Sequence, residues 1–437
     1  MNTIIHSGQT IVHPFGLAIL LLTIVVVLFA KRDKVILAVL FMLVSIPSAQ
    51  RILIMSLDFS FIRILLLFVL LRILSRKENK HVLFGKPDKI LFIWMVWSIF
   101  AYGMLYGEIS AFISRTGYMI DAVGAYIVGR TYIRSWEDLH KVIIFLSYAS
   151  VLVAVFFIIE RMTGKNMFSI FGGVPEYTMI RNDRLRCQGP FSHPIMAGLF
   201  WATFLPWIGA AWFSHSINRK LLIIATISML LIVGNSASST PVMAILIGGF
   251  GLYMYRAKRI LPLYRWGIIF LLFSLHLVME KPVWHLIARI DLAGGSTGWH
   301  RYYLIEKSID YFNEWWLVGT VSTAHWGHGL FDVTNQYILE GVRSGFLGML
   351  LFVFFLLSVF KKTGLAIKST TSAKETWLLW GGGVALFVHS ISFISVSYFG
   401  QIVSYFYMFI GILVSLSDHV LQRKRDTYKN DYGSKIV

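Results

Sequence analysis

Residues 14–34 read PFGLAILLLTIVVVLFAKRDK, an apolar run over 14–30 that ends in a cluster of charged residues. A helix that crosses a bilayer needs about 17–25 mainly apolar residues, and this run is long enough. A cleaved signal peptide carries its charges before the apolar run and a small-residue cleavage site after it. Here the charges come last, so the stretch predicts a retained membrane span.

Similar apolar runs recur along the whole 437-residue chain. Apolar residues make up 57% of it and charged residues 14%, whereas about a quarter of a typical soluble protein is charged. We therefore predict one all-α, polytopic membrane domain over residues 1–437, with about thirteen transmembrane helices in a range of roughly twelve to fourteen. The expected helices cover residues 14–30, 35–47, 58–74, 88–106, 112–129, 142–159, 193–213, 221–233, 241–255, 266–279, 345–360, 376–396 and 400–417.

The net charge of +18 lies mainly in short stretches between the apolar runs. This placement argues against a nucleic-acid partner and for contact with membrane lipids, because Lys and Arg are retained on the cytoplasmic side. The basic stretches are residues 31–34, 76–89, 130–141, 219–220, 256–265, 361–374 and 423–429. Placing each of them inside predicts an external N-terminus and a cytoplasmic tail over residues 420–437. Cys187 is the single cysteine, so no disulfide forms within the chain.

Two segments on the predicted outer side are longer than simple connections. We call residues 160–192 the first long segment and residues 280–344 the second long segment. Loops of such length in a compact protein are usually functional or disordered. Both are rich in aromatic residues and glycine, so we expect them to be ordered, with helical pieces in the second.

The first long segment leads through RNDRLRCQGPFSHP, residues 181–194, into an apolar helix. Arginine carries a planar fork of donors that matches phosphate oxygens, and a helix N-terminus also favours an anion. Ser192 is the expected N-cap, with Pro194 in the first turn. Arg184 and Arg186 are two residues apart and would share a face of an extended strand. The expected anion site comprises Arg181, Arg184, Arg186 and His193.

Alternatives to an anion site remain open at this stretch. The arginines could bind lipid headgroups or pair with Asp183 and Glu176. A second helix start, NSASSTP at residues 235–241, could add hydroxyl and backbone donors to the same ligand, with Ser239 or Thr240 as N-cap. Capping alone explains that stretch equally well.

Charged residues also interrupt the apolar runs. Arg63, Arg115 and Asp121 lie within predicted spans, where a charge costs about 2.5–3.5 kcal/mol at the bilayer centre. Arg63 and Arg115 could line an outward cavity or extend to the membrane surface. Asp121 lies deeper and requires a partner that the sequence does not identify.

The second long segment contains HWGHGLFD, residues 325–332, which is dense in groups suited to acid–base chemistry. The candidates are His325, His328 and Asp332. The histidine spacing also permits a metal ion, although two histidines at this spacing are a weak metal signal, and hydrogen bonding within the loop is the simpler alternative. We expect neither a metal nor a cofactor.

Five stretches, in this order, resemble the O-antigen ligase/polymerase superfamily. They are ERMTGKN (160–166), RLRCQGPFSHPIMAG (184–198), GNSASSTP (234–241), GWHRYYLIEKSIDYF (298–312) and TNQYILEGVRSGFLG (334–348). Together they extend over about the C-terminal two-thirds of the chain. Each motif is loose, and their order and placement in the outer segments carry the resemblance.

The resemblance implies a GT-C-like glycosyltransferase of the bacterial inner membrane that acts on undecaprenyl-diphosphate sugars. It implies that Arg184 or Arg186, together with Arg301, binds the diphosphate. An acceptor hydroxyl would attack the anomeric carbon with inversion and without a metal. Further candidates for substrate contact are Arg115, Arg289, Asn335 and Tyr337.

One departure from the family favours a polymerase. In the ligases a catalytic histidine precedes the Asn-x-Tyr motif, whereas Thr334 occupies that position before Asn335 here. We therefore expect Asp332 or a nearby histidine, His328 first, as the base of a polymerase that joins repeat units of an exopolysaccharide or O-antigen. Its partners would be lipid-linked donor and acceptor, and a chain-length regulator protein is a further candidate. The alternatives are an O-antigen ligase and a transporter, although the inverted repeats typical of transporters are not visible.

Overall fold

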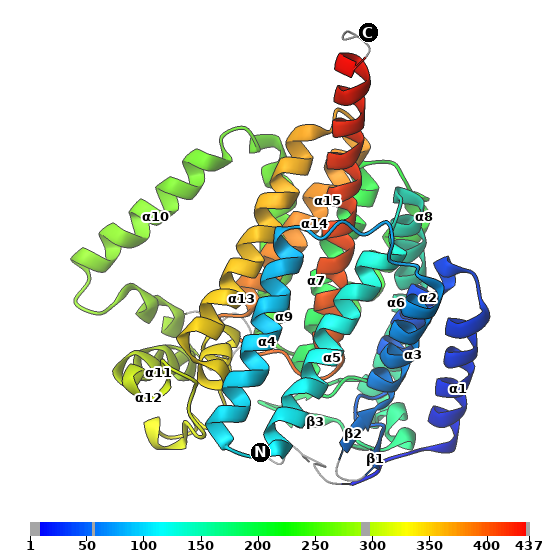
Figure 1. Ribbon diagram of the computed structural model, residues 1–437. Helices are drawn as coiled ribbons and strands as arrows, with labels where there is room; N and C mark the ends of the chain where they lie inside the picture. The colour runs from blue at the N-terminus through cyan, green and yellow to red at the C-terminus, as the bar shows by residue number, and fades with distance from the viewer. Residues whose placement is uncertain (1–8, 55–56, 290–297, 434–437) are drawn as a thin grey trace.

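Long helices run up and down through the protein and connect at two opposite ends (Figure 1). The structure is a computed structural model, and it describes residues 9–54, 57–289 and 298–433. The helices of the bundle are α1 (Pro14–Phe29), α2 (Arg32–Ser45), α3 (Phe61–Arg76), α4 (Lys86–Tyr106), α5 (Ile109–Tyr132), α6 (Trp136–Thr163), α7 (Pro194–Phe213), α8 (Arg219–Asn235), α9 (Ser239–Tyr253), α13 (Gln336–Ser369), α14 (Ala373–Ser392) and α15 (Gln401–Gly433). Helix α10 (Leu261–Val278) extends away from the bundle, and none of its described side chains is buried (Figure 1).

The fold is predominantly helical, as the sequence predicts for a membrane protein. Among the described residues, five helices are long and apolar enough to cross a bilayer, namely α4, α6, α7, α13 and α15. Each of the apolar ranges expected to form a helix overlaps a helix of the structure. The all-α class and the membrane-embedded character are therefore supported, whereas the number of spans stays a prediction.

The bounds of α13 and α15 differ most from the prediction. Helix α13 begins at Gln336 rather than near residue 345, because the Asn335 side chain accepts hydrogen bonds from two backbone N–H groups of its first turn. The helix breaks at Ser344 and Gly345, where Gly345 has a φ of 72° that favours glycine. Helix α15 continues through most of the expected tail, and Arg423 pairs there with Glu375 at 2.6 Å.

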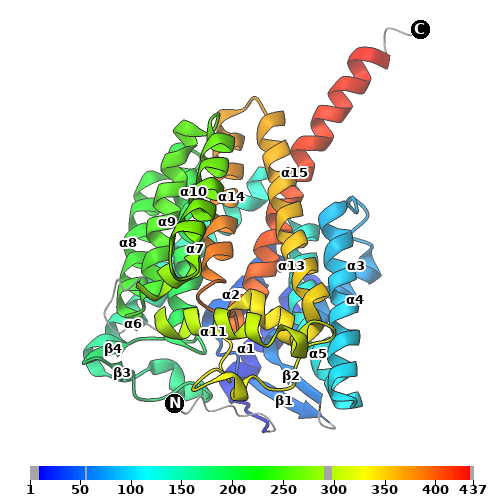
Figure 2. The same ribbon diagram turned by 90° about the vertical axis from the view of Figure 1, so that its left-hand side faces the viewer.

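Short elements of both long segments gather at the end of the bundle opposite to the end of α15 (Figures 1 and 2). The first long segment forms the 3-10 helix η1 (Met167–Phe171) and an antiparallel hairpin of β3 (Met179–Arg181) and β4 (Arg184–Arg186). The second forms η3 (Val283–Arg289), α11 (Gly298–Asp310), α12 (Phe312–Trp315) and η4 (Ala324–Trp326). A further hairpin, β1 (Arg51–Ile54) with β2 (Leu57–Ser60), lies at the same end.

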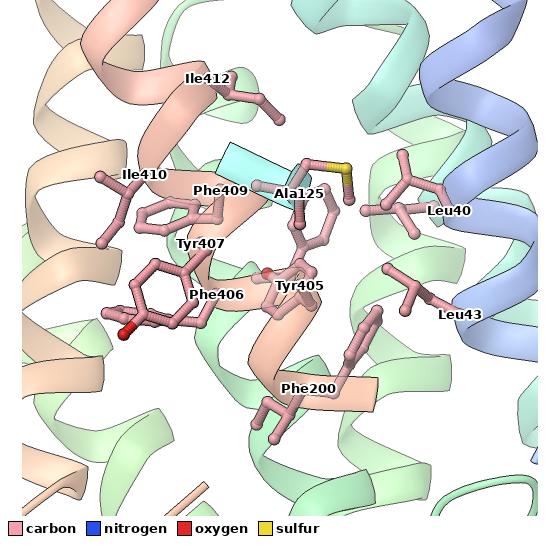
Figure 3. Packing of buried hydrophobic residues seen from close by; sticks show 14 of the residues in the cluster. Leu40, Leu43, Ala125, Phe200, Tyr405, Phe406, Tyr407, Phe409, Ile410 and Ile412 are labelled. Carbon is pink, nitrogen blue, oxygen red and sulfur yellow. The ribbon is translucent and has the colours of Figure 1, made fainter. Parts of the chain in front are cut away.

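Helix α15 forms the centre of the apolar core. Aromatic side chains from one stretch of it, including Tyr405, Phe406 and Phe409, pack among Phe200 of α7 and leucines of α2 (Figure 3). Helices α5 and α15 approach each other so closely that a side chain at Gly129 would collide with the backbone of α15. The glycine therefore permits this contact. This packed core provides a rigid support for the ends of the helices.

Candidate functional site

The β3–β4 hairpin positions the arginines of the first long segment. Met179 lies opposite Arg186, and Arg181 lies opposite Arg184. Arg186 is 2% exposed, and its Nη2 donates to the hydroxyl of Ser238 at 2.8 Å. Its Nε is buried without a hydrogen-bond partner among the described residues. Arg184 is exposed, so the two arginines expected to share a face lie in different surroundings.

Arg301 of the second long segment reaches the same region from α11. Its Nη2 donates to the hydroxyl of Thr240 at 3.1 Å, and its Nε donates to the carbonyl of Ser395 at 3.2 Å. Thr240 lies in the first turn of α9, and Ser238 is the residue just before that helix. Arg186 and Arg301, which are far apart in sequence, therefore both contact the start of α9.

Both N-cap positions differ from the prediction. Helix α9 is preceded by Ser238 rather than capped by Ser239 or Thr240, and the Ser238 hydroxyl donates to the Ser236 carbonyl instead of capping. Helix α7 is capped by His193 rather than Ser192, because the Nδ1 of His193 accepts from the N–H of Ile195 at 3.1 Å. The expected position of a proline in the first turn of α7 is confirmed.

The ionisable groups at this end influence one another, and His193 is neutral near pH 7 as a result. Burial, and then the nearby Arg181, lower the pKa of Arg186 to about 10. Burial, and then Arg186 and Arg181, lower the pKa of His193 to about 4. Burial and Arg181 also lower the pKa of Arg301. We name Arg181, Arg186, His193 and Arg301 the arginine–histidine cluster.

An anion would be a better partner for this cluster than its present neighbours are. In the described part of the chain, the polar partners of Arg186 and Arg301 are hydroxyl, carbonyl and thioether groups rather than carboxylates. Two helices, α7 and α9, begin beside it, and the N–H groups of a helix start add partial positive charge. A bound anion would offset the mutual repulsion that lowers these pKa values.

The predicted acid–base residues lie in the second long segment beside α11. The Nε2 of His325 lies 2.8 Å from a carboxylate oxygen of Glu314, which also accepts from the indole N–H of Trp326. Asp332 and His328 are exposed. The backbone carbonyl of Asp332 bonds to His300, the neighbour of Arg301 in α11, at 3.2 Å. The structure thus connects Asp332 to the helix that carries Arg301.

No metal centre is visible at these residues. Within residues 9–54, 57–289 and 298–433, no group of three or more His, Cys, Asp or Glu side chains is arranged to hold a metal ion.

Burial opposes ionisation of Glu314, but the hydrogen bonds from Trp326 and His325 lower its pKa overall. His325 is therefore held by a local carboxylate contact.

Three of the residues predicted to contact substrate form a helix cap, a hydrogen bond between helices and a buried ion pair. Asn335 caps α13 and donates to the carbonyl of Ile394, the neighbour of Ser395. Tyr337 donates to the carbonyl of Ser390 in α14 at 2.8 Å. Arg115 is 3% exposed and pairs with Glu340 at 2.9 Å. These three side chains join α13 to the α14–α15 connection, to α14 and to α5, respectively.

Arg289 ends the 3-10 helix η3, but its side chain lies outside the part of the chain that the structure describes. Its predicted contact with substrate stays a prediction.

Two residues near the cluster were missed by the sequence reasoning. Ser395 supplies a carbonyl to Arg301 from the connection between α14 and α15, which carries no recognisable motif. Glu160 is 1% exposed and accepts hydrogen bonds from the backbone N–H groups of Gln188 and Gly189. A carboxylate at the end of an apolar run is the signal that could have identified Glu160, because such a group needs buried donors.

No protein-family profile and no curated protein sequence matches the chain.

Proposed function

We propose that this protein is a membrane polymerase that joins polyprenyl-diphosphate-linked oligosaccharide repeat units into an exopolysaccharide or O-antigen chain. The observation that carries the proposal is the convergence of Arg186 and Arg301 on the first turn of α9. The two arginines come from the two long segments. Arg181 is close enough to lower the pKa of both, and Arg186 in turn lowers the pKa of His193.

A diphosphate is the ligand whose chemistry fits this cluster. Guanidinium groups pair with phosphate oxygens through parallel hydrogen bonds, and the starts of α7 and α9 favour negative charge. The Nε of Arg186, which has no hydrogen-bond partner among the described residues, offers a donor in a buried position. The apolar helices that can cross a bilayer would keep a polyprenyl carrier in the membrane while its diphosphate reaches the cluster.

The proposed reaction is an inverting transfer. A hydroxyl oxygen of the acceptor unit forms a bond to the anomeric carbon of the donor, and the bond from that carbon to the diphosphate oxygen breaks. The electron pair stays on the polyprenyl diphosphate, where the arginines stabilise the growing charge. The hydroxyl proton passes to a base, for which the exposed Asp332 and His328 are the candidates. The guanidinium groups supply the charge stabilisation, so the proposed reaction uses no metal.

The membrane arrangement is part of the proposal. We propose about thirteen spans in a GT-C-like arrangement, with the cluster on the outer face of a bacterial inner membrane and the carrier being undecaprenyl diphosphate. The break of α13 at Ser344 and Gly345 lies at the edge of the predicted span rather than at its centre. A break near the bilayer midplane is typical of transporters, so this position does not favour transport.

The test is to incubate the purified protein in lipid nanodiscs with an undecaprenyl-diphosphate-linked repeat unit. A ladder of products is expected from a polymerase, whereas a ligase would give one transfer product and only with a lipid core acceptor. Arg186→Ala and Arg301→Ala should each lower the rate by about 100-fold or more, since each removes a donor to the leaving group. Arg161→Ala is the matched control, because Arg161 is an exposed arginine of the same segment that donates to the carbonyl of Leu185 and not to the start of α9 in the described part of the chain.

Normal ladders from both Arg186→Ala and Arg301→Ala would contradict the proposed role of the cluster. The absence of any ladder from the wild-type protein, with intact donor remaining, would contradict the polymerase itself. Size-exclusion chromatography of each variant separates a lost donor from a lost fold.

A further inference from the structure

A groove of about 850 Å³ opens between α4, α13 and α15 at the end of the bundle away from the arginine–histidine cluster. Its floor and walls are mainly apolar, with side chains that include Leu83, Phe84, Leu351, Phe354 and Leu357. Phe354 is 51% and Leu357 is 55% exposed, so parts of this apolar wall face out of the bundle. The groove has the size and lining typical of a small-molecule site.

Basic side chains line one end of this groove. They are Lys86 at the start of α4, Lys361 and Lys362 on α13, and Arg425 on α15. Asp418 is the carboxylate among the lining residues, and it already pairs with Lys362 at 2.6 Å and with Arg130 at 2.9 Å.

Because Asp418 is neutralised by two cations, the exposed Lys86, Lys361 and Arg425 give this end of the groove a positive excess. An occupant that fits must therefore carry negative charge at one end only.

The spacing along α13 matches half a bilayer. From Leu351 to Lys361 the helix rises about 15 Å at 1.5 Å per residue. The hydrocarbon core of a bilayer is about 30 Å thick, so one leaflet contributes about 15 Å. The break at Gly345 precedes this stretch, so the rise applies to one continuous helix. An acyl chain can lie along the apolar part while a phosphate reaches the basic end.

We propose that the groove binds one anionic phospholipid of the cytoplasmic leaflet, with an acyl chain against Leu351, Phe354 and Leu357 and the phosphate beside Lys86, Lys361 and Arg425. Basic pockets between transmembrane helices on the cytoplasmic side are suited to anionic headgroups. A small soluble phosphate would leave the apolar floor uncovered, and a neutral lipid would leave the three cations without a counter-charge. The inference is independent of the proposed polymerase activity and needs only that this end faces the cytoplasm.

The experiment measures lipid retention by the purified, detergent-solubilised protein with native mass spectrometry, using phosphatidylglycerol and phosphatidylcholine as probes. The wild-type protein should retain phosphatidylglycerol preferentially. The triple variant Lys86→Gln/Lys361→Gln/Arg425→Gln should retain it at least about tenfold less, with phosphatidylcholine unchanged. The matched control is Lys258→Gln/Arg259→Gln/Arg265→Gln, which removes two cations of the α9–α10 connection and one of α10, all outside the groove.

A second variant tests the apolar part. Ser358→Phe fills the groove without changing charge and should reduce retention of both lipids, whereas glycerol phosphate at millimolar concentration should not displace phosphatidylglycerol. Equal retention by the triple variant and the control, or equal binding of both lipids by the wild-type protein, would overturn the proposal. Displacement by glycerol phosphate would overturn it in favour of a soluble anion. Thermal unfolding of each variant shows whether the fold is kept.

Discussion

The cap that His193 forms on α7 depends on its charge state. Its Nδ1 accepts a hydrogen bond from the N–H of Ile195, so that nitrogen has to be unprotonated for the helix cap to form. Burial, Arg186 and Arg181 favour the same neutral form and lower its pKa to about 4. In the unfolded chain a histidine has a pKa near 6.5. The folded protein therefore resists a proton that the unfolded chain accepts.

The sign of the pH dependence follows from this difference. Above about pH 6.5 both states are neutral, and the stabilisation is fully present. As the pH falls from about 6.5 towards 4, the unfolded state gains a proton first, so stability is lost in that window. The loss attributable to His193 is at most about 2–3 kcal/mol at pH 4.5.

We predict that the melting temperature of the detergent-solubilised protein falls more between pH 7 and pH 4.5 than that of His193→Asn. The asparagine amide oxygen can cap α7 but does not titrate in this range. Scanning calorimetry at both pH values measures the two differences, and the other titrating groups contribute equally to both proteins. Identical pH dependence would show that the His193 proton is not linked to folding.

At the level of single residues, the sequence predicted which basic residues come together, but not their geometry. Arginines before a helix start indicated an anion site, and Arg181, Arg186, His193 and Arg301 do come together. The different burial of Arg184 and Arg186 was not predictable, because it depends on how the β3–β4 hairpin packs on α9. Arg184, at the exposed end of β4, differs from Arg186 for that reason.

Between helices, buried ion pairs connect segments that are distant in sequence. Arg115 of α5 lies 2.9 Å from Glu340 of α13, with 3% and 0% of the two side chains exposed. The other carboxylate oxygen of Glu340 accepts from the amide of Gln336 at 2.8 Å. Because both charges are desolvated, removing either partner would lower the free energy of unfolding by a large amount.

We predict that Glu340→Gln destabilises the protein by about 3–5 kcal/mol, because it leaves the Arg115 charge buried without a counter-charge. The double variant Arg115→Met/Glu340→Met should recover more than half of that loss. Denaturant unfolding in a mild detergent measures both. A double variant that is as unstable as Glu340→Gln would contradict the argument from the unpaired charge. Polymer synthesis by a stable double variant would show that the reaction requires no contact of Arg115 with substrate.

The same ion pairs show what the sequence could not supply. A charge within an apolar run indicated that Asp121 needs a partner, and Arg63 provides it at 2.6 Å. The two residues are 58 positions apart and lie on α3 and α5. Apolar length and basic flanks predict where helices lie. They do not predict which helices adjoin, since many packings satisfy the same hydrophobic pattern.

For the whole molecule, the two ends of the bundle differ in their positive charges. At the end that holds the groove, Lys and Arg flank apolar helices in short connections, as expected for a cytoplasmic face. At the other end, arginines lie in ordered segments and contact the start of α9. Both proposals depend on this assignment, because lipid-linked sugars would reach the cluster from outside and the lipid groove would face inside.

We predict that the Pro175→Cys variant reacts with a membrane-impermeant maleimide in intact bacterial cells, and that Lys258→Cys reacts only after permeabilisation. Both positions are exposed, on the first long segment and on the α9–α10 connection. The natural Cys187 should give little background, since it is 0% exposed and burial raises its thiol pKa to about 12. The reverse labelling pattern would place the arginine–histidine cluster in the cytosol. Neither transfer of an externally presented lipid-linked sugar nor an inner-leaflet lipid in the groove would then remain tenable.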